Sequence, residues 1–251
     1  MNPRVIPNKS LSSKKEAAAN AAASPRIARD AGFGAGPVKR STKGNLIVIT
    51  GPSGVGKGTV VQRLLDEVPN LSKSVSATTR AMRPGERDGV DYFFVTDEKF
   101  AEMLENNEFM EWAEYSGNFY GTPRKWVAEQ LRVKRSADGI EQSGTDVILE
   151  IEVDGAKQIR DRFAQAVLIF LSPPSFDELK SRLKGRGTES GAKIQLRLHK
   201  ARQEMRERGL FYYEVVNDNI DEAVKNLMHI VYAERCRIRE TKAPGASDEH
   251  Y

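Results

Sequence analysis

From Gly44 onward, continuous apolar runs alternate with stretches in which apolar residues recur at helical spacing. The runs at residues 46–50, 147–149 and 167–171 contain few polar side chains, which is typical of parallel strands buried on both faces. A further strand is predicted at residues 213–216. The apolar pattern therefore predicts a series of buried core strands that are far apart in the sequence.

Helices are predicted between these strands. An amphipathic run begins at Val60, and residues 154–163 and about 221–239 show the same spacing. Ser175 and Glu178 match a capping box, in which Ser175 caps a helix and Glu178 reaches back from its third position. The alternation predicts an α/β fold with a parallel sheet core flanked by helices, and with ligands bound at the carboxyl ends of the strands.

Two segments interrupt the alternation. Residues 74–122 are rich in β-forming and aromatic residues around one short helical stretch at 97–106, which predicts an inserted β-rich lobe. Residues 182–209 are dense in Arg and Lys and poor in apolar residues. This composition is typical either of a small helical lid over phosphates or of a solvated pair of basic helices. The polar stretch at 133–144 is interpreted as an enlarged surface loop.

Positive charge is concentrated at the N-terminus. The whole chain has a net charge of +4, but residues 1–43 hold nine Lys and Arg against Glu16 and Asp30, a net charge of +7. The other 208 residues are mildly acidic, so basicity gives no reason to expect nucleic-acid binding by the fold. We expect a disordered basic tail at 1–43, with an organelle transit peptide as the alternative. The folded domain is expected at 44–240, followed by a disordered tail at 241–251.

Composition indicates in which cellular compartment, and with which kinds of partner, the chain is expected. Cys236 is the only cysteine, so no disulfide can form within the chain, which fits a reducing compartment. No apolar run approaches the ~18 residues of a membrane span, and the N-terminus lacks the apolar core of a secretory signal. We therefore expect a cytoplasmic protein with no membrane or nucleic-acid partner, as a monomer or a homodimer.

A glycine-rich segment between the first predicted strand and its helix carries the strongest chemical signal. It consists of Gly51, Pro52, Ser53, Gly54, Val55, Gly56, Lys57, Gly58 and Thr59. Its glycines let successive N–H groups point at a phosphate chain, and the following helix N-terminus favours anions. Lys57 adds a positive charge for the β- and γ-phosphates. The segment matches G-x-x-x-x-G-K, so it predicts a nucleoside triphosphate site rather than a chance glycine loop, although Gly58 stands where Ser or Thr is usual.

A second phosphate site is indicated by two arginines. Arg80 and Arg83 lie three residues apart in a Thr-Thr-Arg-Ala-Met-Arg-Pro-Gly stretch. Arginine binds phosphate through paired donors, which lysine cannot provide. Most surface arginines are simply solvated, but a P-loop already supplies one phosphate site. The pair is therefore interpreted as the site for the phosphate of an acceptor.

Further motifs follow the P-loop in a fixed order. They are Ser-Val-Ser-Ala-Thr-Thr-Arg-Ala-Met-Arg-Pro-Gly-Glu at 74–86, Gly-Val-Asp-Tyr at 89–92, Glu-Phe-Met-Glu-Trp-Ala at 108–113, Tyr-Gly-Thr at 120–122, Gly-Arg-Gly-Thr-Glu at 185–189 and Val-Asn-Asp at 216–218. From about Gly44 to Arg239, interrupted near 133–144, the ordered set resembles the guanylate kinase family. The resemblance implies a P-loop nucleoside monophosphate kinase that transfers the γ-phosphate of ATP to GMP with Mg²⁺. The lobe at 74–122 would bind GMP and the segment at 182–209 would be the lid.

The resemblance also implies a GMP site. The matching residues are Ser76, Arg80, Arg83, Tyr92, Glu111, Tyr120, Thr122, Glu150 and Glu152. The two arginines and the two tyrosine hydroxyls would hold the GMP phosphate. Glu111 would accept from guanine N1–H and the 2-amino group, which adenine cannot offer, and the hydroxyls of Ser76 and Thr122 would bond the base. Without the resemblance, Glu111 is interpreted as a surface acid beside Trp112 and the tyrosines as core aromatics.

The donor side follows from the same resemblance. Residues 51–59 and Asn217 would bind ATP, with Asn217 beside the adenine. Lys57, Arg80, Arg186 and Arg197 would form the catalytic set, in which Arg186 and Arg197 close over the ATP phosphates. Glu150 and Glu152 would lie near GMP and the waters of Mg²⁺, and Thr59 is the nearest P-loop hydroxyl for the metal.

Two other functions remain possible at this stage. One is a related P-loop kinase for another phosphorylated acceptor, such as a ribose bisphosphate. The other is the guanylate-kinase-like peptide-binding module of scaffold proteins. Such modules usually have damaged P-loops and lack lid arginines, whereas Lys57, Arg186 and Arg197 are all present here.

Overall fold

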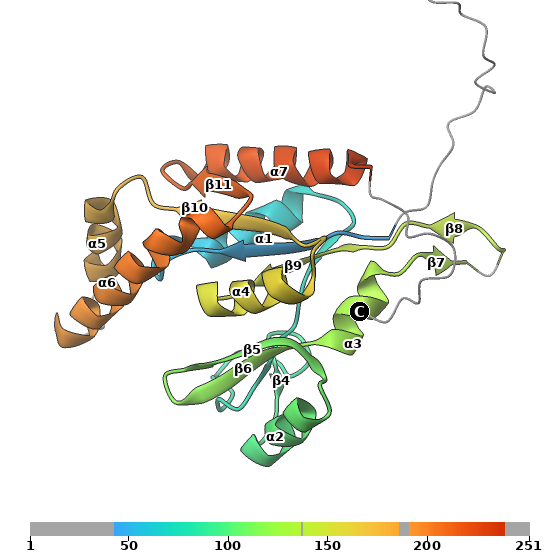
Figure 1. The fold of residues 1–251 in the computed structure, drawn as a ribbon, viewed down its shortest axis with the longest axis horizontal. Coiled ribbons are helices and arrows are strands. Elements are labelled where there is room, and N and C mark those ends of the chain that lie inside the picture. The colour runs from blue at the N-terminus through green and yellow to red at the C-terminus, as the bar shows by residue number, and fades with distance from the viewer. Residues whose placement is uncertain (1–42, 137, 186–190, 239–251) are drawn as a thin grey trace, which may run out of the picture. The chain divides into compact units, whose positions relative to one another are not determined.

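The computed structural model describes residues 43–136, 138–185 and 191–238. The expected tails at 1–43 and 241–251 lie outside the described residues, apart from Lys43, and so does Arg186 of the predicted lid. Within the described part, strands and helices alternate around one parallel sheet, and a second sheet lies beside it (Figure 1). This arrangement confirms the predicted α/β class with a separate β-rich insertion.

The core sheet has five parallel strands in the order β11-β10-β1-β9-β2. Their bounds are β1 Leu46–Thr50, β2 Leu71–Lys73, β9 Asp146–Glu150, β10 Val167–Ser172 and β11 Tyr213–Val216. Each predicted core strand is present, and β2 is an additional edge strand that is too short to give a pattern. The central strand β1 has β9 on one side and β10 on the other, so the strand order reverses beside it, which is where α/β proteins bind ligands.

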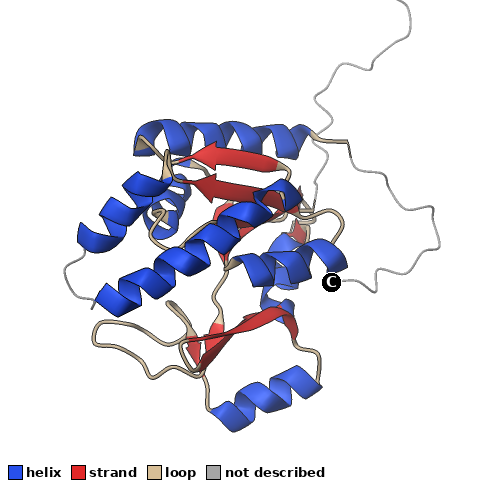
Figure 2. Ribbon diagram, turned by 60° about the vertical axis from the view of Figure 1, so that its left-hand side comes forward, coloured by secondary structure: helices blue, strands red, loops and turns tan. Residues whose placement is uncertain are grey.

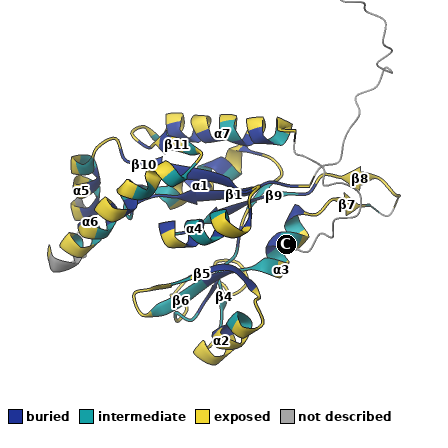
Figure 3. Cartoon of the chain, in the orientation of Figure 1, coloured by how far each residue is buried: buried dark blue, intermediate teal, exposed yellow. Residues whose placement is uncertain are grey.

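Helices cover both faces of this sheet (Figure 2). They are α1 Lys57–Glu67, α3 Arg124–Leu131, α4 Val153–Arg162, α5 Phe176–Gly185, α6 Gly191–Arg206, the 3₁₀ turn η1 Glu207–Leu210 and α7 Ile220–Cys236. Ile47 and Ile49 of β1 pack in one cluster with α1 and α7, whereas Leu46 and Val48 pack in another with α3 and α4. This division explains why the strand is apolar at every one of these positions, and Figure 3 shows the central strands of the core sheet mostly in the dark blue of buried residues.

The insertion forms its own sheet in the order β4-β3-β6-β5. Its elements are β3 Ala77–Thr78, β4 Phe93–Phe94, α2 Asp97–Glu105, β5 Phe109–Tyr115 and β6 Asn118–Pro123. Phe100 of α2 stacks on Phe109 and Phe119, with ring centroids 4.5 and 5.5 Å apart. These aromatic contacts give the lobe a small core of its own, separate from the core of the main sheet.

Three local predictions need correction. Residues 133–144 are not wholly irregular, because β7 Lys134–Arg135 and β8 Glu141–Gln142 pair as a short exposed hairpin. Helix α7 ends at Cys236, since the backbone at Arg237 is extended. The backbone N–H of Glu178 donates to the Ser175 hydroxyl, as expected. The Glu178 carboxylate, however, accepts from Arg182 one turn later instead of reaching back.

Asp146 ties the last helix to the base of the core sheet. Its carboxylate is buried at the start of β9 and accepts from the backbone N–H of Asn45 at 2.6 Å. Its second oxygen accepts from Arg235 Nε of α7 at 2.7 Å. Arg235 also donates to the carbonyl oxygens of Pro69 and Asn70, before β2. One buried carboxylate therefore joins α7, β9 and the entries to β1 and β2.

We expect Asp146→Ala to destabilise the fold by about 3 kcal/mol, because it leaves a buried N–H and a guanidinium without their acceptor. Urea unfolding followed by circular dichroism measures the change. Glu102→Ala is the matched control, since it removes an exposed carboxylate whose ion pair among the described residues is with Lys99 on the same helix. Equal effects of the two substitutions would contradict the structural role of Asp146.

Candidate active site

The glycine-rich loop runs from the carboxyl end of β1 into α1. Gly56 precedes the helix with a left-handed φ of 97°, and a Cβ atom there would lie 2.8 Å from the side-chain nitrogen of Asn217. That amide donates to the carbonyl oxygen of Val55 at 2.8 Å. Because residue 56 is a glycine, the Asn217 side chain, which follows β11, can come close enough to hold the loop through its hydrogen bond to Val55.

The loop has the features of an anion site. Helix α1 begins at Lys57 without a side-chain cap and without an acidic residue in its first turn. Its first N–H groups therefore remain available for an anion. The Lys57 ammonium donates to the carbonyl oxygen of Gly51 at 2.6 Å, which folds it back over the loop. Arg197 of α6 donates to the Ser53 hydroxyl through Nη2 at 2.8 Å, so a predicted lid arginine lies at the loop.

Two carboxylates lie at the carboxyl end of β9, where Glu150 is the last residue of the strand and Glu152 follows it. Glu150 pairs with Lys73 at 2.6 Å, and Glu152 lies 3.7 Å from Lys57 and 3.3 Å from Lys200. Burial by itself would raise the pKa of the Glu152 carboxyl, but the two lysines hold that pKa below its ordinary value. The negative charges of both acids are therefore compensated by lysines, and Glu152 in turn partly neutralises Lys57 of the phosphate loop.

The predicted acceptor-phosphate residues gather in the inserted lobe. Both terminal nitrogens of Arg80 donate to Glu86, at 3.1 and 2.8 Å, and its guanidinium lies 5.3 Å from the ring centre of Tyr92. The rings of Tyr92 and Tyr120 meet edge to face at 6.0 Å. Glu86 also accepts from the backbone N–H of Arg83 at 2.8 Å, and it holds the pKa of Arg80 above its ordinary value. The structure thus brings Arg80 and the backbone of Arg83 to one carboxylate, with the two tyrosine rings beside Arg80.

Glu111 is the most deeply buried carboxylate of the predicted set, with only 4% of its surface exposed. The Thr122 hydroxyl donates to one of its oxygens at 2.6 Å. The other oxygen would lie 2.4 Å from a Cβ at Gly155, so the glycine in the first turn of α4 makes room for it. Burial raises the pKa of Glu111 to about 7, although hydrogen bonds from Thr122 oppose this shift. A carboxyl in this state takes up either a proton or an N–H donor near neutral pH.

The lobe residues and the loop residues face one edge of the core. Glu111 contacts Gly155, three residues beyond Glu152 on the same segment. Burial raises the pKa of the Tyr92 hydroxyl, and Lys73 and Glu150 act on it from the core. Ser76 precedes β3, and its carbonyl oxygen accepts from Phe93 N at 2.9 Å. The predicted acceptor and donor residues therefore converge on the carboxyl end of β9.

Sequence reasoning missed several residues of this region. Lys73 pairs with Glu150, Glu86 orients Arg80, and Arg182 donates to the carbonyl oxygen of Asn217 at 3.0 Å. Glu86 stands within a motif, three residues after Arg83, and that spacing is the only signal that could have found it. Single lysines and arginines at surface positions give no pattern, because their partners are brought together only by the fold.

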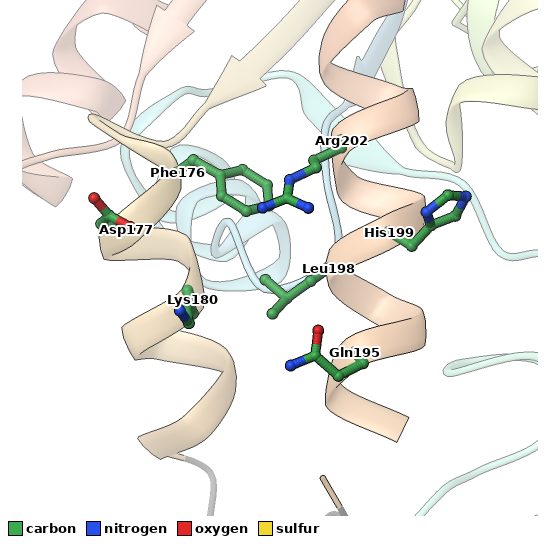
Figure 4. Close-up of a pocket in the computed structure, with 7 residues that line it drawn as sticks. All are labelled: Phe176, Asp177, Lys180, Gln195, Leu198, His199 and Arg202. Carbon is green, nitrogen blue, oxygen red and sulfur yellow. The ribbon is translucent and has the colours of Figure 1, made fainter. Parts of the chain in front are cut away.

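A separate pocket of about 340 Å³ lies between α5 and α6 (Figure 4). Phe176 and Leu198 form its apolar side, and the Arg202 guanidinium lies 4.6 Å from the ring centre of Phe176. Lys180 and His199 complete a mainly basic rim. None of the predicted site residues lines this pocket, so it is distinct from the loop and lobe sites.

The described residues set limits on metal and membrane binding. No group of three or more His, Cys, Asp or Glu among them could hold a metal ion by itself. No helix in this part of the chain is long and apolar enough to span a membrane. Thr59 is exposed in the first turn of α1, and Glu150 Oε1 lies 3.5 Å from the position of a Cβ on the neighbouring Gly58. These are oxygen donors of the kind that Mg²⁺ prefers, and too few for a cage built by the protein alone.

Comparisons with known proteins agree on one family. The guanylate kinase family model matches residues 43–234. The guanylate kinase of Synechococcus sp. (strain JA-3-3Ab) is 48% identical over 196 residues, which cover 78% of this chain and 86% of that protein. The guanylate kinase of Parasynechococcus marenigrum (strain WH8102) is 52% identical over 184 residues, covering 73% and 96%. The crystal structure of guanylate kinase from Anaplasma phagocytophilum superimposes with a TM-score of 0.61 at 34% identity, over 78% of this chain and 88% of that one.

The buried state of Glu111 predicts a pH dependence of stability. In the unfolded chain its carboxyl loses its proton near the ordinary pKa of 4.5, whereas in the folded protein it keeps the proton up to about pH 7. Its contribution to stability is therefore fully present below pH 4.5 and is lost as the pH rises to about 7. Between pH 5 and 8 this loss amounts to roughly 3 kcal/mol.

We expect Glu111→Gln to remove this component, so that the stability of the variant relative to the unsubstituted protein increases with pH. Urea unfolding at half-unit steps between pH 5 and 8 measures the difference. Glu114→Gln, on the exposed side of the same strand, is the control and should give parallel curves. A Glu111→Gln curve that also stays parallel would show that Glu111 titrates normally.

Proposed function

The chain belongs to the guanylate kinase family and is an ATP:GMP phosphotransferase, and from this premise we propose which of its residues carry each part of the reaction. The observation that carries the assignment is the buried carboxylate of Glu111, which lies in the lobe opposite the phosphate loop and is fixed by Thr122. Glu111 supplies the acceptor site with a group that recognises the base, and the glycine-rich loop supplies the donor site with backbone N–H groups that bind phosphates.

The donor site consists of residues 51–59 and Asn217. The N–H groups that begin α1 and the Lys57 ammonium bind the β- and γ-phosphates of ATP. For this, Lys57 leaves the Gly51 carbonyl oxygen, which accepts its hydrogen bond in the free protein. Asn217 lies beside the adenine, where its contact with Val55 couples base binding to the shape of the loop.

The acceptor phosphate binds between Arg80, Arg83 and the hydroxyls of Tyr92 and Tyr120. In the free protein Glu86 occupies both terminal nitrogens of Arg80. A phosphate carries about two negative charges near neutral pH and also accepts paired hydrogen bonds, so it competes well with one carboxylate. Glu86 therefore holds the Arg80 guanidinium in place until GMP binds.

Guanine is read by Glu111 with Thr122 and Ser76. The guanine N1–H and 2-amino group both donate, and one carboxylate accepts both. The Thr122 hydroxyl already donates to Glu111, so its own lone pairs are left to accept from the base. Adenine presents an acceptor at N1 and has no 2-amino group, so AMP cannot supply the two donors that the ionised carboxylate accepts from guanine.

The reaction needs charge neutralisation and alignment more than proton transfer. The acceptor is already a phosphate anion, so no general base is required. Lys57 and Arg197 act on the donor phosphates while Arg80 holds the acceptor, and Arg186, which lies outside the described residues, completes the set. An arginine that completes such a site contributes about 10³–10⁵ in rate.

Guanylate kinases use ATP together with a divalent metal ion, and we propose Mg²⁺ for this chain. Thr59 is the protein hydroxyl that would bind the metal, with Glu150 beside it and Glu152 near its waters, while nucleotide phosphates supply the remaining oxygens. When bound, Mg²⁺ neutralises the charge that develops on the phosphate oxygens.

The finer assignments of partners and location rest on the sequence. We propose a monomer or homodimer in the cytoplasm that binds ATP and GMP and no nucleic acid. The single cysteine and the mildly acidic charge of residues 44–251 support this proposal. The lobe at 74–122 and the lid at 182–209 are proposed to close toward the core when both nucleotides bind.

A coupled assay for ADP release tests the assignment with GMP, AMP, CMP and UMP as acceptors. We expect turnover with GMP alone at micromolar-to-millimolar substrate. Glu111→Gln should lower kcat/KM for GMP by about 10- to 100-fold, because its amide presents a donor to a base that also donates. Glu114→Gln is the matched control on the same strand and should leave the value unchanged. Equal turnover of GMP and AMP, or full GMP activity in Glu111→Gln, would refute the proposed base-reading role.

A further inference from the structure

Lys200 lies where three parts of the fold meet. It is a residue of α6, and its ammonium is 3.3 Å from Glu152 Oε2 at the carboxyl end of β9. The same ammonium lies 4.9 Å from the ring centre of Tyr115, at the end of β5 in the inserted lobe. A single side chain of the helix that carries Arg197 thus contacts both the acidic edge of the core and the lobe that carries Glu111.

The contact with Glu152 reaches the phosphate loop. The other oxygen of this carboxylate, Oε1, lies 3.7 Å from the Lys57 ammonium. Lys200 and Lys57 therefore divide one negative charge between them. The more of that charge Lys200 neutralises, the more weakly Glu152 holds Lys57, and the more readily Lys57 turns to a phosphate.

Glu204, one turn further along α6, fixes Lys200 in this position. Its carboxyl is buried, with 5% of its surface exposed, and burial together with the neighbouring Glu152 raises its pKa. Its closest cation is Lys200, at 3.7 Å. Burial would lower the pKa of Lys200, but Glu152 and Glu204 together raise it above its ordinary value. The ammonium therefore stays charged between two carboxyls.

Lys157 is a suitable comparison for Lys200, because the two lysines have similar surroundings but different ion-pair partners. Both lysines line a pocket of about 320 Å³ between α4 and α6. Their side chains are similarly exposed, 32% for Lys157 and 38% for Lys200. Lys157 pairs with Asp154 and Glu207, which belong to no proposed substrate site. It is therefore a natural control for a lysine in the same surroundings.

We propose that Lys200 is a positioning residue that couples the GMP site to the ATP site. Tyr115 and Glu111 lie on the same strand, so GMP bound at Glu111 fixes β5 and with it the aromatic face that Lys200 contacts. Lys200 then holds Glu152, and Lys57 is released to the ATP phosphates. This inference rests on the proposed positions of the two substrates, and it predicts that each substrate tightens the binding of the other to the same extent.

Calorimetry on the whole chain tests this coupling. The dissociation constant of GMP is measured alone and with a saturating non-hydrolysable ATP analogue and Mg²⁺. We expect the analogue to tighten GMP binding to the unsubstituted protein by about 5- to 150-fold. In Lys200→Met this factor should fall toward one, and Lys200→Arg, which can still bridge Glu152 and Tyr115, should restore most of it. Lys157→Met should match the unsubstituted protein.

A second pair of variants tests the aromatic contact without changing any charge. Tyr115 is well exposed, so Tyr115→Phe and Tyr115→Leu both leave the cores of the protein intact. Phenylalanine keeps the ring face and should keep the coupling, whereas leucine should reduce it. Coupling that persists in both Lys200→Met and Tyr115→Leu would overturn the inference, as would an unsubstituted protein that binds both ligands independently. Failure of the unsubstituted protein to bind GMP or the analogue at all would instead refute the proposed substrate sites.

Discussion

The parallel pairing of β1 with β9 places a phosphate-binding loop directly beside two carboxylates. Val48 and Ile49 lie in register with Leu149 and Glu150, so the carboxyl ends of the two strands coincide. A loop that binds phosphate must be positive, and the acids beside it must be compensated. The ion pairs of Glu152 with Lys57 and of Glu150 with Lys73 meet both requirements. The inserted lobe, α4 and α6 all lie beside this charged edge of the core sheet.

The same compensation of charge in the free protein recurs at each group that is proposed to bind a substrate. Lys57 is occupied by Gly51 and Glu152, and Arg80 is occupied by Glu86. None of the ion pairs among the described residues involves Glu111, and burial raises its pKa to about 7, so that near this pH a proton neutralises the carboxyl in about half of the molecules. We therefore propose that substrate binding exchanges these partners for groups of the nucleotides while the lobe and the lid close. Because the charged side chains are already held by partners in the free protein, the exchange needs little further ordering of the side chains themselves, as efficient electrostatic catalysis requires.

The sequence predicts the core strands and the glycine-rich loop better than it predicts the side-chain contacts at the site. The continuous apolar runs define the core strands because both faces of each are buried, and the glycine pattern of the loop follows from backbone geometry. By contrast, Lys200 and Glu204 stand on a helix whose composition indicates a solvated or lid segment, yet Leu198 and Ala201 of the same helix pack in the core. Glu152, Lys200 and Tyr115 are distant in sequence, so only the folded chain shows that they share a charge and a ring face.

Glu111 is expected to exchange a proton for guanine when GMP binds. Calorimetric titration of GMP at pH 6.5, in two buffers with different ionisation enthalpies, measures the protons released on binding. The titrations use GMP concentrations that saturate both the unsubstituted protein and Glu111→Gln, so that proton release from the GMP phosphate is common to both. With a pKa of about 7 for Glu111, the unsubstituted protein should release about three quarters of a proton more than the variant. Equal proton release by the two proteins would show that Glu111 does not exchange a proton for guanine.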